Sequence, residues 1–193
     1  MRKKTSFYAG HFLSISLLWV SFGGLASAET NHPLIGRDAP LFSLTDQNGK
    51  TFKLEERRAK GWTILFFYPK AGTPGCTKQV CAFRDAIKGI QQLNAAVYGI
   101  SSDSVQAQKR FHSENKLLFS LLSDEKGEVA NQFRNRRQGS AMANRRTFII
   151  DPELKVRQVL DRVDPAADPE NVIRELKALQ ASNATKKLPA QAN

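Results

Sequence analysis

Two hydrophobic patterns divide this chain into segments, one typical of buried strands and the other typical of helices. Compact apolar runs between turn-forming residues predict strands, whereas apolar residues at three- and four-residue spacing predict helices that bury one face. The predicted strands are 41–45, 51–54, 63–67, 96–101, 118–122, 147–150 and 156–160. The predicted helices are one that starts near Cys76, one over 104–115, one that Asp124 caps and that continues to Phe133, and one from Asp168 to about Ala181.

The order of these segments predicts the fold class. Strands separated by helices imply parallel crossover connections, whereas the last two strands are joined by the short turn 151–154 and should pair antiparallel. Asn48-Gly49, between the first two strands, is typical of a tight hairpin turn. The sequence therefore predicts an α/β fold, a thioredoxin-like sandwich in which a central mixed β-sheet is flanked by helices.

The N-terminal segment has the composition of a targeting sequence. Residues 1–28 combine a basic MRKK start, an apolar stretch over 12–25 and the small triplet Ala26-Ser27-Ala28, which predicts a signal peptide cleaved before Glu29. An uncleaved anchor is the alternative, but the apolar run is short for a membrane span of about 20 residues. We expect export to a bacterial periplasm or a thylakoid lumen, with no stable membrane insertion after cleavage.

The rest of the chain divides into one domain and a tail. Residues 29–181 are enough for a single domain with its own hydrophobic core. Residues 182–193 are polar, alanine-rich and without periodicity, so we expect a disordered tail there.

The charge of the chain is strongly basic. The formal net charge of +11 falls to +8 without the three basic residues of the MRKK start, and much of the excess lies in 134–137 and 145–146. A basic run invites a nucleic-acid interpretation, but these runs lack interleaved aromatic residues and any recognisable nucleic-acid module. A solvated basic face, with no nucleic-acid partner, is the better interpretation.

The two cysteines mark the chemistry-bearing stretch. Cys76 and Cys81 stand where the apolar run 63–67 has ended and the proline- and glycine-rich stretch 69–75 has interrupted regular structure. Cys76 therefore falls in the first turn of the following helix. Unpaired backbone N–H groups and the helix dipole favour an anion there, so we expect the thiolate form of Cys76 to be stabilised.

Two simpler explanations of the cysteine pair are weaker. The sequence does not favour zinc binding, because His32 and His112 add no recognised ligand spacing, and we expect both histidines to be surface residues. A static disulfide would suit an exported protein. However, five residues along an intact helix separate the Cα atoms by roughly 8 to 9 Å, and a disulfide requires less than ~7 Å. A bond between Cys76 and Cys81 must therefore unwind a turn of helix, which suits a bond made and broken in a cycle.

The residues around the cysteines resemble a known family. Residues 67–85, FYPKAGTPGCTKQVCAFRD, are similar to the active-site segment of peroxiredoxins, specifically the Q type, also called bacterioferritin comigratory protein. The family pattern Pro-x-x-x-Thr-x-x-Cys falls on Pro69, Thr73 and Cys76, and a second cysteine five residues on is a hallmark of this subgroup. The resemblance extends from about Pro33 to Leu179.

A second segment carries the same resemblance. Residues 145–151, RRTFIID, are similar to the arginine strand of the family, and alignment on Phe148 assigns the catalytic arginine to Arg145. The neighbouring Arg146 should point to the opposite face because side chains alternate along a strand.

The resemblance implies a peroxidase cycle that needs no cofactor and no metal. Cys76 would attack a peroxide and become a sulfenic acid, with Arg145 and Thr73 stabilising and positioning the reactants and Pro69 shaping the pocket. Cys81 would then form a disulfide with Cys76, and a thioredoxin-like protein would reduce it. We expect a monomer. An exported thiol-disulfide oxidoreductase and a binding module with a passive disulfide remain as alternatives.

Overall fold

The computed structural model describes residues 32–161 and 163–187, and the elements below lie within these ranges. The strands are β1 (Ser43–Asp46), β2 (Thr51–Lys53), β3 (Trp62–Phe67), β4 (Ala95–Ser101), β5 (Ser120–Ser123), β6 (Arg146–Ile150) and β7 (Val156–Leu160). The helices are α1 (Pro74–Gln92), α2 (Val105–Glu114), α3 (Glu128–Gln132) and α4 (Asp168–Lys187), with a 3₁₀ turn, η1, at Leu54–Arg57. Each predicted strand is present, with its ends displaced by no more than two residues.

The described strands form one mixed sheet in the order β2-β1-β5-β4-β3-β6-β7. In the centre, β4 pairs parallel with both β3 and β5, because α1 and α2 provide the crossover connections. The outer strands pair antiparallel, β6 with both β3 and β7, and β1 with both β2 and β5. The predicted α/β sandwich around a mixed sheet is therefore confirmed.

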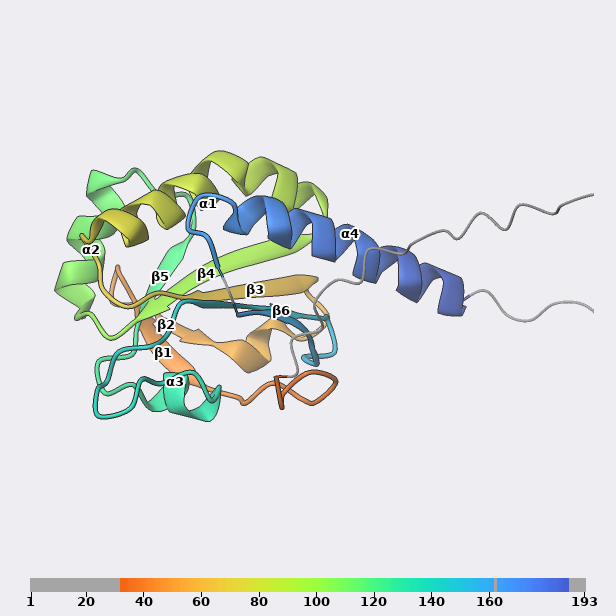
Figure 1. Ribbon diagram of the computed structural model, residues 1–193, viewed down its shortest axis with the longest axis horizontal. Coiled ribbons are helices and arrows are strands. Elements are labelled where there is room, and N and C mark those ends of the chain that lie inside the picture. The colour runs from red at the N-terminus through yellow and green to blue at the C-terminus, as the bar shows by residue number, and fades with distance from the viewer. Residues whose placement is uncertain (1–31, 162, 188–193) are drawn as a thin grey trace, which may run out of the picture.

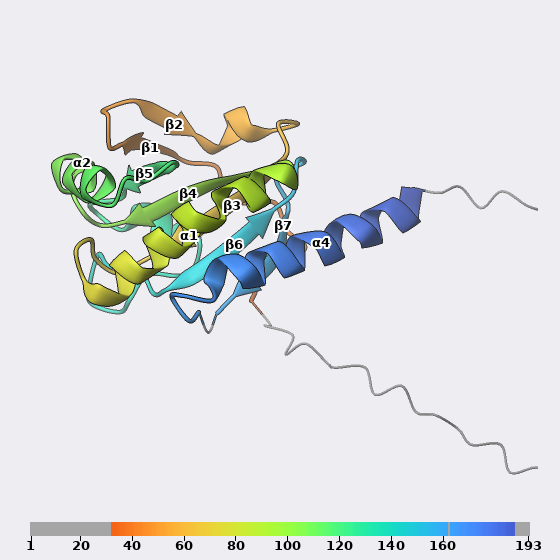
Figure 2. The same cartoon turned by 90° about the horizontal axis from the view of Figure 1, so that it is seen from above.

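Helices and loops cover both faces of this sheet (Figures 1 and 2). On one face α1 and α4 lie side by side, and the buried ring of Phe83 from α1 stacks on Phe66 of β3 with centroids 4.5 Å apart. Val172 and Leu176 bring the apolar side of α4 into the same core. The other face is covered by η1, α3 and the first described residues, whose apolar side chains form a second core. The start of α1 lies at the end of β3, where the sheet carries the candidate site.

The third helix is shorter than the sequence predicts. It begins at Glu128, four residues beyond Asp124, after Gly127 in the left-handed region with φ of 66°. The buried Asp124 carboxylate accepts the N–H groups of Val129 and Ala130 at 3.2 and 2.8 Å, and burial raises the pKa of Asp124. Asp124 thus holds the start of α3 from a distance, because a turn separates it from the first helical residue.

The last helix is longer than predicted. It continues to Lys187, so residues 182–187 are helical and the expectation of a disordered tail from 182 is wrong for them. Apolar periodicity ends near Leu179, but the alanine-rich sequence beyond it favours helix without that periodicity. The final residues, 188–193, and the predicted signal peptide, 1–28, lie outside the described residues. In the described part of the chain, no helix has the length and apolar character to cross a membrane.

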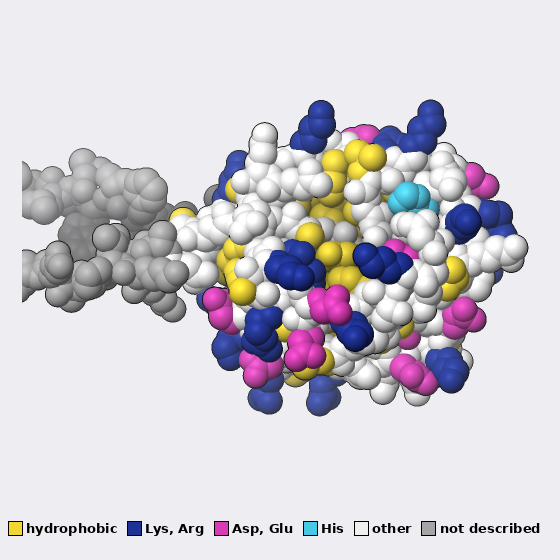
Figure 3. Space-filling model, turned by 180° about the vertical axis from the view of Figure 1, so that it is seen from behind, with side chains coloured by type: hydrophobic (Ala, Val, Ile, Leu, Met, Phe, Trp, Pro, Cys, Tyr) yellow, Lys and Arg dark blue, Asp and Glu magenta, His cyan; other side chains and the backbone are white. Residues whose placement is uncertain are grey.

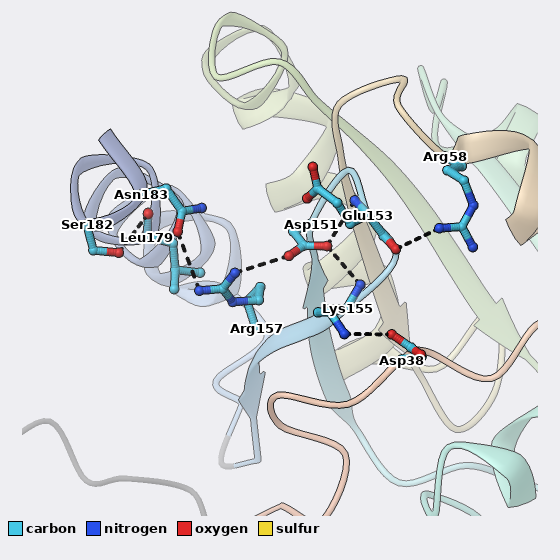
Figure 4. Close-up of polar contacts among 9 residues, drawn as sticks. All are labelled: Asp38, Arg58, Asp151, Glu153, Lys155, Arg157, Leu179, Ser182 and Asn183. Atoms are coloured by element: carbon cyan, nitrogen blue, oxygen red, sulfur yellow. Dashed lines mark hydrogen bonds and ion pairs between the residues drawn. The ribbon is translucent and has the colours of Figure 1, made fainter. Parts of the chain in front are cut away.

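The later half of α4 is tied to the turn between β6 and β7 (Figure 4). The buried Asp151 carboxylate accepts the backbone N–H groups of Glu153 and Lys155 at 3.1 and 2.8 Å, which closes the turn. Arg157 bridges to the helix, donating to Asp151 at 3.1 Å and to Asn183 at 3.5 Å. These contacts fix α4 at the end of the sheet remote from the start of α1.

The basic segment forms a closed loop on the surface. The side-chain amides of Asn135 and Asn144 each donate to the other residue's carbonyl oxygen, at 3.0 and 3.2 Å. Arg134, Arg136 and Arg137 are exposed, and none forms an ion pair with a residue that the structure describes. Elsewhere, on the face seen in Figure 3, basic and acidic side chains are interspersed, as is typical of a solvated surface.

Candidate active site

Cys76 lies in the first turn of α1, as predicted. Pro74 occupies the first helical position, where its missing N–H and fixed φ suit a helix start. Cys76 follows as the third residue of the helix and its side chain is fully buried. Gly72, with φ of 75°, supplies the left-handed conformation that turns the loop between β3 and α1. The sulfur is therefore held in the core next to the N–H groups of the helix start.

Arg145, the residue immediately before β6, reaches this sulfur. Its Nη2 lies 3.3 Å from Cys76 Sγ, and its Nη1 donates to Gln79 Oε1. The register explains the placement, because Arg146 is opposite Phe67, the last residue of β3, so Arg145 lies beside the first residue of the Cys76 loop. A guanidinium there favours an anionic sulfur and stabilises negative charge that develops near it.

The adjacent arginine points away, as predicted from strand alternation. Arg146 forms an ion pair with Asp161 and donates to the Arg134 carbonyl oxygen at 3.1 Å. The assignment of Arg145 rather than Arg146 to the Cys76 site therefore agrees with the geometry.

The buried carboxylate of Asp168 is linked to Arg145 through Gln79. Asp168 Oδ2 accepts a hydrogen bond from Gln79 Nε2 and another from Thr147 Oγ1, both at 2.7 Å. Burial raises the pKa of Asp168 to about 6, an effect that the hydrogen bonds from Thr147 and Gln79 and the charge of Arg145 partly offset. A continuous chain of contacts thus runs from Asp168 through Gln79 and Arg145 to Cys76.

Thr73 and Pro69 belong to the loop that leads into α1. Thr73 is the N-cap residue, but its side chain accepts no hydrogen bond from the helix N–H groups. Its hydroxyl instead donates to the Lys70 carbonyl oxygen at 3.0 Å. Pro69 is half-buried directly after Tyr68, at the end of β3. The structure therefore brings Cys76 and Arg145 into contact and places Thr73 and Pro69 in the loop beside them.

Comparison with known proteins identifies the family of this chain. The sequence profile of the AhpC/TSA family matches residues 35–159. The chain belongs to the AhpC/TSA family. A putative peroxiredoxin of Mycobacterium tuberculosis is 43% identical over 122 residues, covering 62% of this chain and 79% of the relative. The chloroplastic peroxiredoxin Q of Arabidopsis thaliana is 39% identical over 137 residues, covering 68% and 59%.

Solved structures agree with this membership. The crystal structure of peroxidoxin BcpB from Mycobacterium tuberculosis superposes with a TM-score of 0.70 at 36% identity, covering 75% of this chain and 96% of that one. The bacterioferritin comigratory protein of Xanthomonas campestris, described for its alkyl peroxide reduction activity, gives a TM-score of 0.66 at 26% identity, covering 71% and 90%. The thioredoxin-like fold and the resemblance to Q-type peroxiredoxins are thus confirmed, and the family supports a thiol-dependent peroxidase.

The second cysteine of this AhpC/TSA chain has different surroundings. Cys81 is half-buried on α1, and its thiol lies 3.5 Å from Asn115 Oδ1. Both cysteines are free thiols, and α1 is helical from Pro74 through Gln92. Because an intact helix holds residues five apart at roughly 8 to 9 Å between Cα atoms, this is a state in which the two sulfurs cannot bond.

Several residues of the site were not predicted from sequence. Gln79 shares the face of Cys76 because it is three residues further along the helix, and its side chain is fully buried. A polar residue on this otherwise apolar helix face is the sequence signal that could have found it. Asp103 holds the Cys76 loop by accepting the Ala71 N–H at 2.7 Å. Asp168 was predicted only as a helix start.

His32 and His112, the histidines that the structure describes, lie outside the site. His32 is buried with its ring edge-on to Phe148, so the expectation that it is a surface residue is wrong. Burial lowers the pKa of His32 and of the half-buried His112. No group of three or more possible metal ligands gathers within the described residues.

Proposed function

We propose that this AhpC/TSA protein is a peroxidase that uses Cys76 as the residue oxidised by peroxide. The single observation that carries the proposal is the Arg145 guanidinium 3.3 Å from a buried sulfur in the first turn of a helix. The Cys76 thiolate attacks one peroxide oxygen, the O–O bond breaks, and the departing oxygen takes a proton and leaves as water or an alcohol. Cys76 is left as a sulfenic acid.

The neighbouring groups serve this displacement. Arg145 stabilises the thiolate and the charge that develops on the departing oxygen. The Thr73 hydroxyl donates to the Lys70 carbonyl, so its oxygen is left to accept a hydrogen bond from the peroxide and position it. Pro69 shapes the pocket and keeps water from the sulfur.

Cys81 completes the cycle as the resolving residue. Its thiol attacks the sulfenic acid, water leaves, and a Cys76–Cys81 disulfide forms once the turn of α1 between them has unwound. A thioredoxin-like dithiol protein supplies the two electrons that restore both thiols. Because both cysteines belong to one chain, a monomer is sufficient, and the enzyme is an atypical 2-Cys, thioredoxin-dependent peroxiredoxin.

The place of action follows from the predicted signal peptide. Export would put the peroxidase in a bacterial periplasm or a thylakoid lumen, and would require a reductant of the same compartment. The arrangement at Cys76 favours a peroxidase over a thiol-disulfide oxidoreductase or a passive disulfide, because neither of these requires a guanidinium at the sulfur.

A peroxide-consumption assay tests the proposal. The chain starting at Glu29 is supplied with hydrogen peroxide or an organic hydroperoxide and a thioredoxin system, beside its Cys76→Ser variant. We expect turnover by the first and none by the second, with a Cys76–Cys81 disulfide detected by mass spectrometry in the first. Peroxide consumption by Cys76→Ser at the wild-type rate would refute the assignment.

A further inference from the structure

We propose that Asp168, at the start of α4, is a positioning residue of the peroxidase site, which acts through Gln79 to hold Arg145 on Cys76 and α1 in its helical state. The inference rests on the roles proposed above for Cys76 and Cys81. Asp168 itself touches neither peroxide nor sulfur.

The direction of the hydrogen bonds gives Asp168 this role. A glutamine amide has one accepting and one donating end, and its orientation is set by its partners. Asp168 Oδ2 takes the donating Nε2 of Gln79 at 2.7 Å, so the accepting Oε1 faces Arg145. The reversed amide would turn N–H groups against the guanidinium, leaving two sets of donors without an acceptor.

Burial makes this arrangement unique. Gln79 and Thr147 are fully buried and Asp168 is 1% exposed, so water cannot replace a lost partner. An unpaired buried donor or acceptor is costly, and a network that is fully paired in one arrangement is held in it. The guanidinium is thereby kept 3.3 Å from Cys76 Sγ.

The accepting oxygen of Asp168, rather than its negative charge, orients the Gln79 amide. Both hydrogen bonds end on Oδ2, while Oδ1 is buried without a hydrogen-bond partner among the described residues. A proton on Oδ1 therefore leaves the accepting atom unchanged. An asparagine side chain has the same shape as the protonated acid and has an oxygen that can take the place of Oδ2. Alanine has neither this shape nor this oxygen.

The same contact links Asp168 to the redox state. Gln79 lies between Cys76 and Cys81, in the turn that must unwind before the two sulfurs can bond. Unwinding withdraws Gln79 from both Asp168 and Arg145. The Asp168–Gln79 bond therefore exists only in the helical, peroxide-reactive state, and it slows the passage to the disulfide.

The first experiment measures the reaction of the reduced protein with hydrogen peroxide in a single turnover, at a temperature where every variant is folded. We expect Asp168→Ala to lower the second-order rate constant by about tenfold, because a displaced positioning group lowers the rate. Asp168→Asn should restore most of this loss. The matched control is Asp124→Ala, which removes another buried carboxylate on the opposite face of the sheet and should lower stability without changing the rate constant.

The second experiment tests whether Asp168 acts through Gln79. Gln79→Met keeps the length of the side chain but offers no acceptor to Arg145, and it also serves if Asp168→Ala does not fold. Adding Asp168→Ala to Gln79→Met should change the rate constant by less than about twofold, because the two residues act in series. At high peroxide, either single variant should give more disulfide and less sulfinic acid than the wild type, measured by mass spectrometry.

The outcomes separate this inference from the proposed function. If Cys76→Ser is inert, and Asp168→Ala has the rate constant and the ratio of disulfide to sulfinic acid of the wild type, only the role of Asp168 is refuted. Asp168→Asn as slow as Asp168→Ala would also refute it, since the acceptor would then not be sufficient. If Cys76→Ser reacts like the wild type, the proposed function fails first.

Discussion

The two cysteines of this protein lie on one helix, yet their surroundings differ in every respect that matters for reactivity. Cys76 is fully buried in the first turn of α1 with a guanidinium 3.3 Å away. Cys81 is half-buried in the second turn, and its thiol lies 3.5 Å from the Asn115 amide oxygen. Position along the helix, rather than residue type, is thus the basis of the proposed division into a peroxide-reactive and a resolving thiol.

The largest expected effect comes from removing one thiol and keeping the other. Cys81→Ser should still form a sulfenic acid at Cys76 in one round, then stall or over-oxidise, because no partner resolves it. Steady-state turnover with a thioredoxin system should fall below detection while the first round survives, as measured by mass after a single addition of peroxide. If Cys81→Ser forms no sulfenic acid after a single addition of peroxide, the two thiols do not have the separate roles proposed for them.

The next effect separates the two adjacent arginines. Arg145→Ala should slow peroxide attack by roughly 100-fold, as for removal of an electrostatic stabiliser elsewhere. Arg146→Ala removes the ion pair with Asp161 and should leave this rate nearly unchanged. Single-turnover rates of both variants with hydrogen peroxide make the measurement, and the reverse ranking would contradict the contact at Cys76.

A third prediction concerns the helix that carries both thiols. Forming the disulfide must unwind the turn between them, so amide hydrogen exchange over residues 77–85 should accelerate on oxidation and return on reduction. The buried amides of β3 in the same samples provide the reference. An oxidised protein with a proven Cys76–Cys81 bond and unchanged exchange in this segment would show that the helix does not need to open.

The smallest expected effect is a pH dependence of the free energy of unfolding, which comes from Asp168 behind the Cys76 site. Burial raises the pKa of Asp168 to about 6, so its contribution to stability is fully present below about pH 4 and is lost as the pH rises through 6. Two pKa units correspond to about 3 kcal/mol at most. Asp168→Asn should remove this slope, which denaturant unfolding between pH 4 and 7.5 can measure. If Asp168→Asn leaves the slope unchanged, a group other than Asp168 causes the pH dependence.

The sequence predicted those parts of the site that local signals control. The strand that ends at Phe67, the loop of prolines and glycines and the helix start at Cys76 are all set by neighbouring residues. The choice of Arg145 over Arg146 came from the alignment on Phe148, and strand alternation predicted only that the two side chains point to opposite faces, as their different partners show.

What the sequence did not predict depends on contacts between distant segments. Gln79 and Asp168 are 89 residues apart, and no local pattern shows that their side chains meet in the core. Two helix boundaries differ from the prediction for local reasons: Asp124 binds the start of α3 across an intervening turn, and helix propensity extends α4 beyond Ala181.

The attachment of α4 at both of its ends has a mechanical consequence. The helix spans 20 residues, a length of about 30 Å, with Asp168 bonded into the site at one end and Asn183 bonded to Arg157 near the other. We expect a helix held at both ends to resist bending. When the two sulfurs approach each other, α1 rather than α4 should therefore change shape, and the sheet beneath them should keep its own.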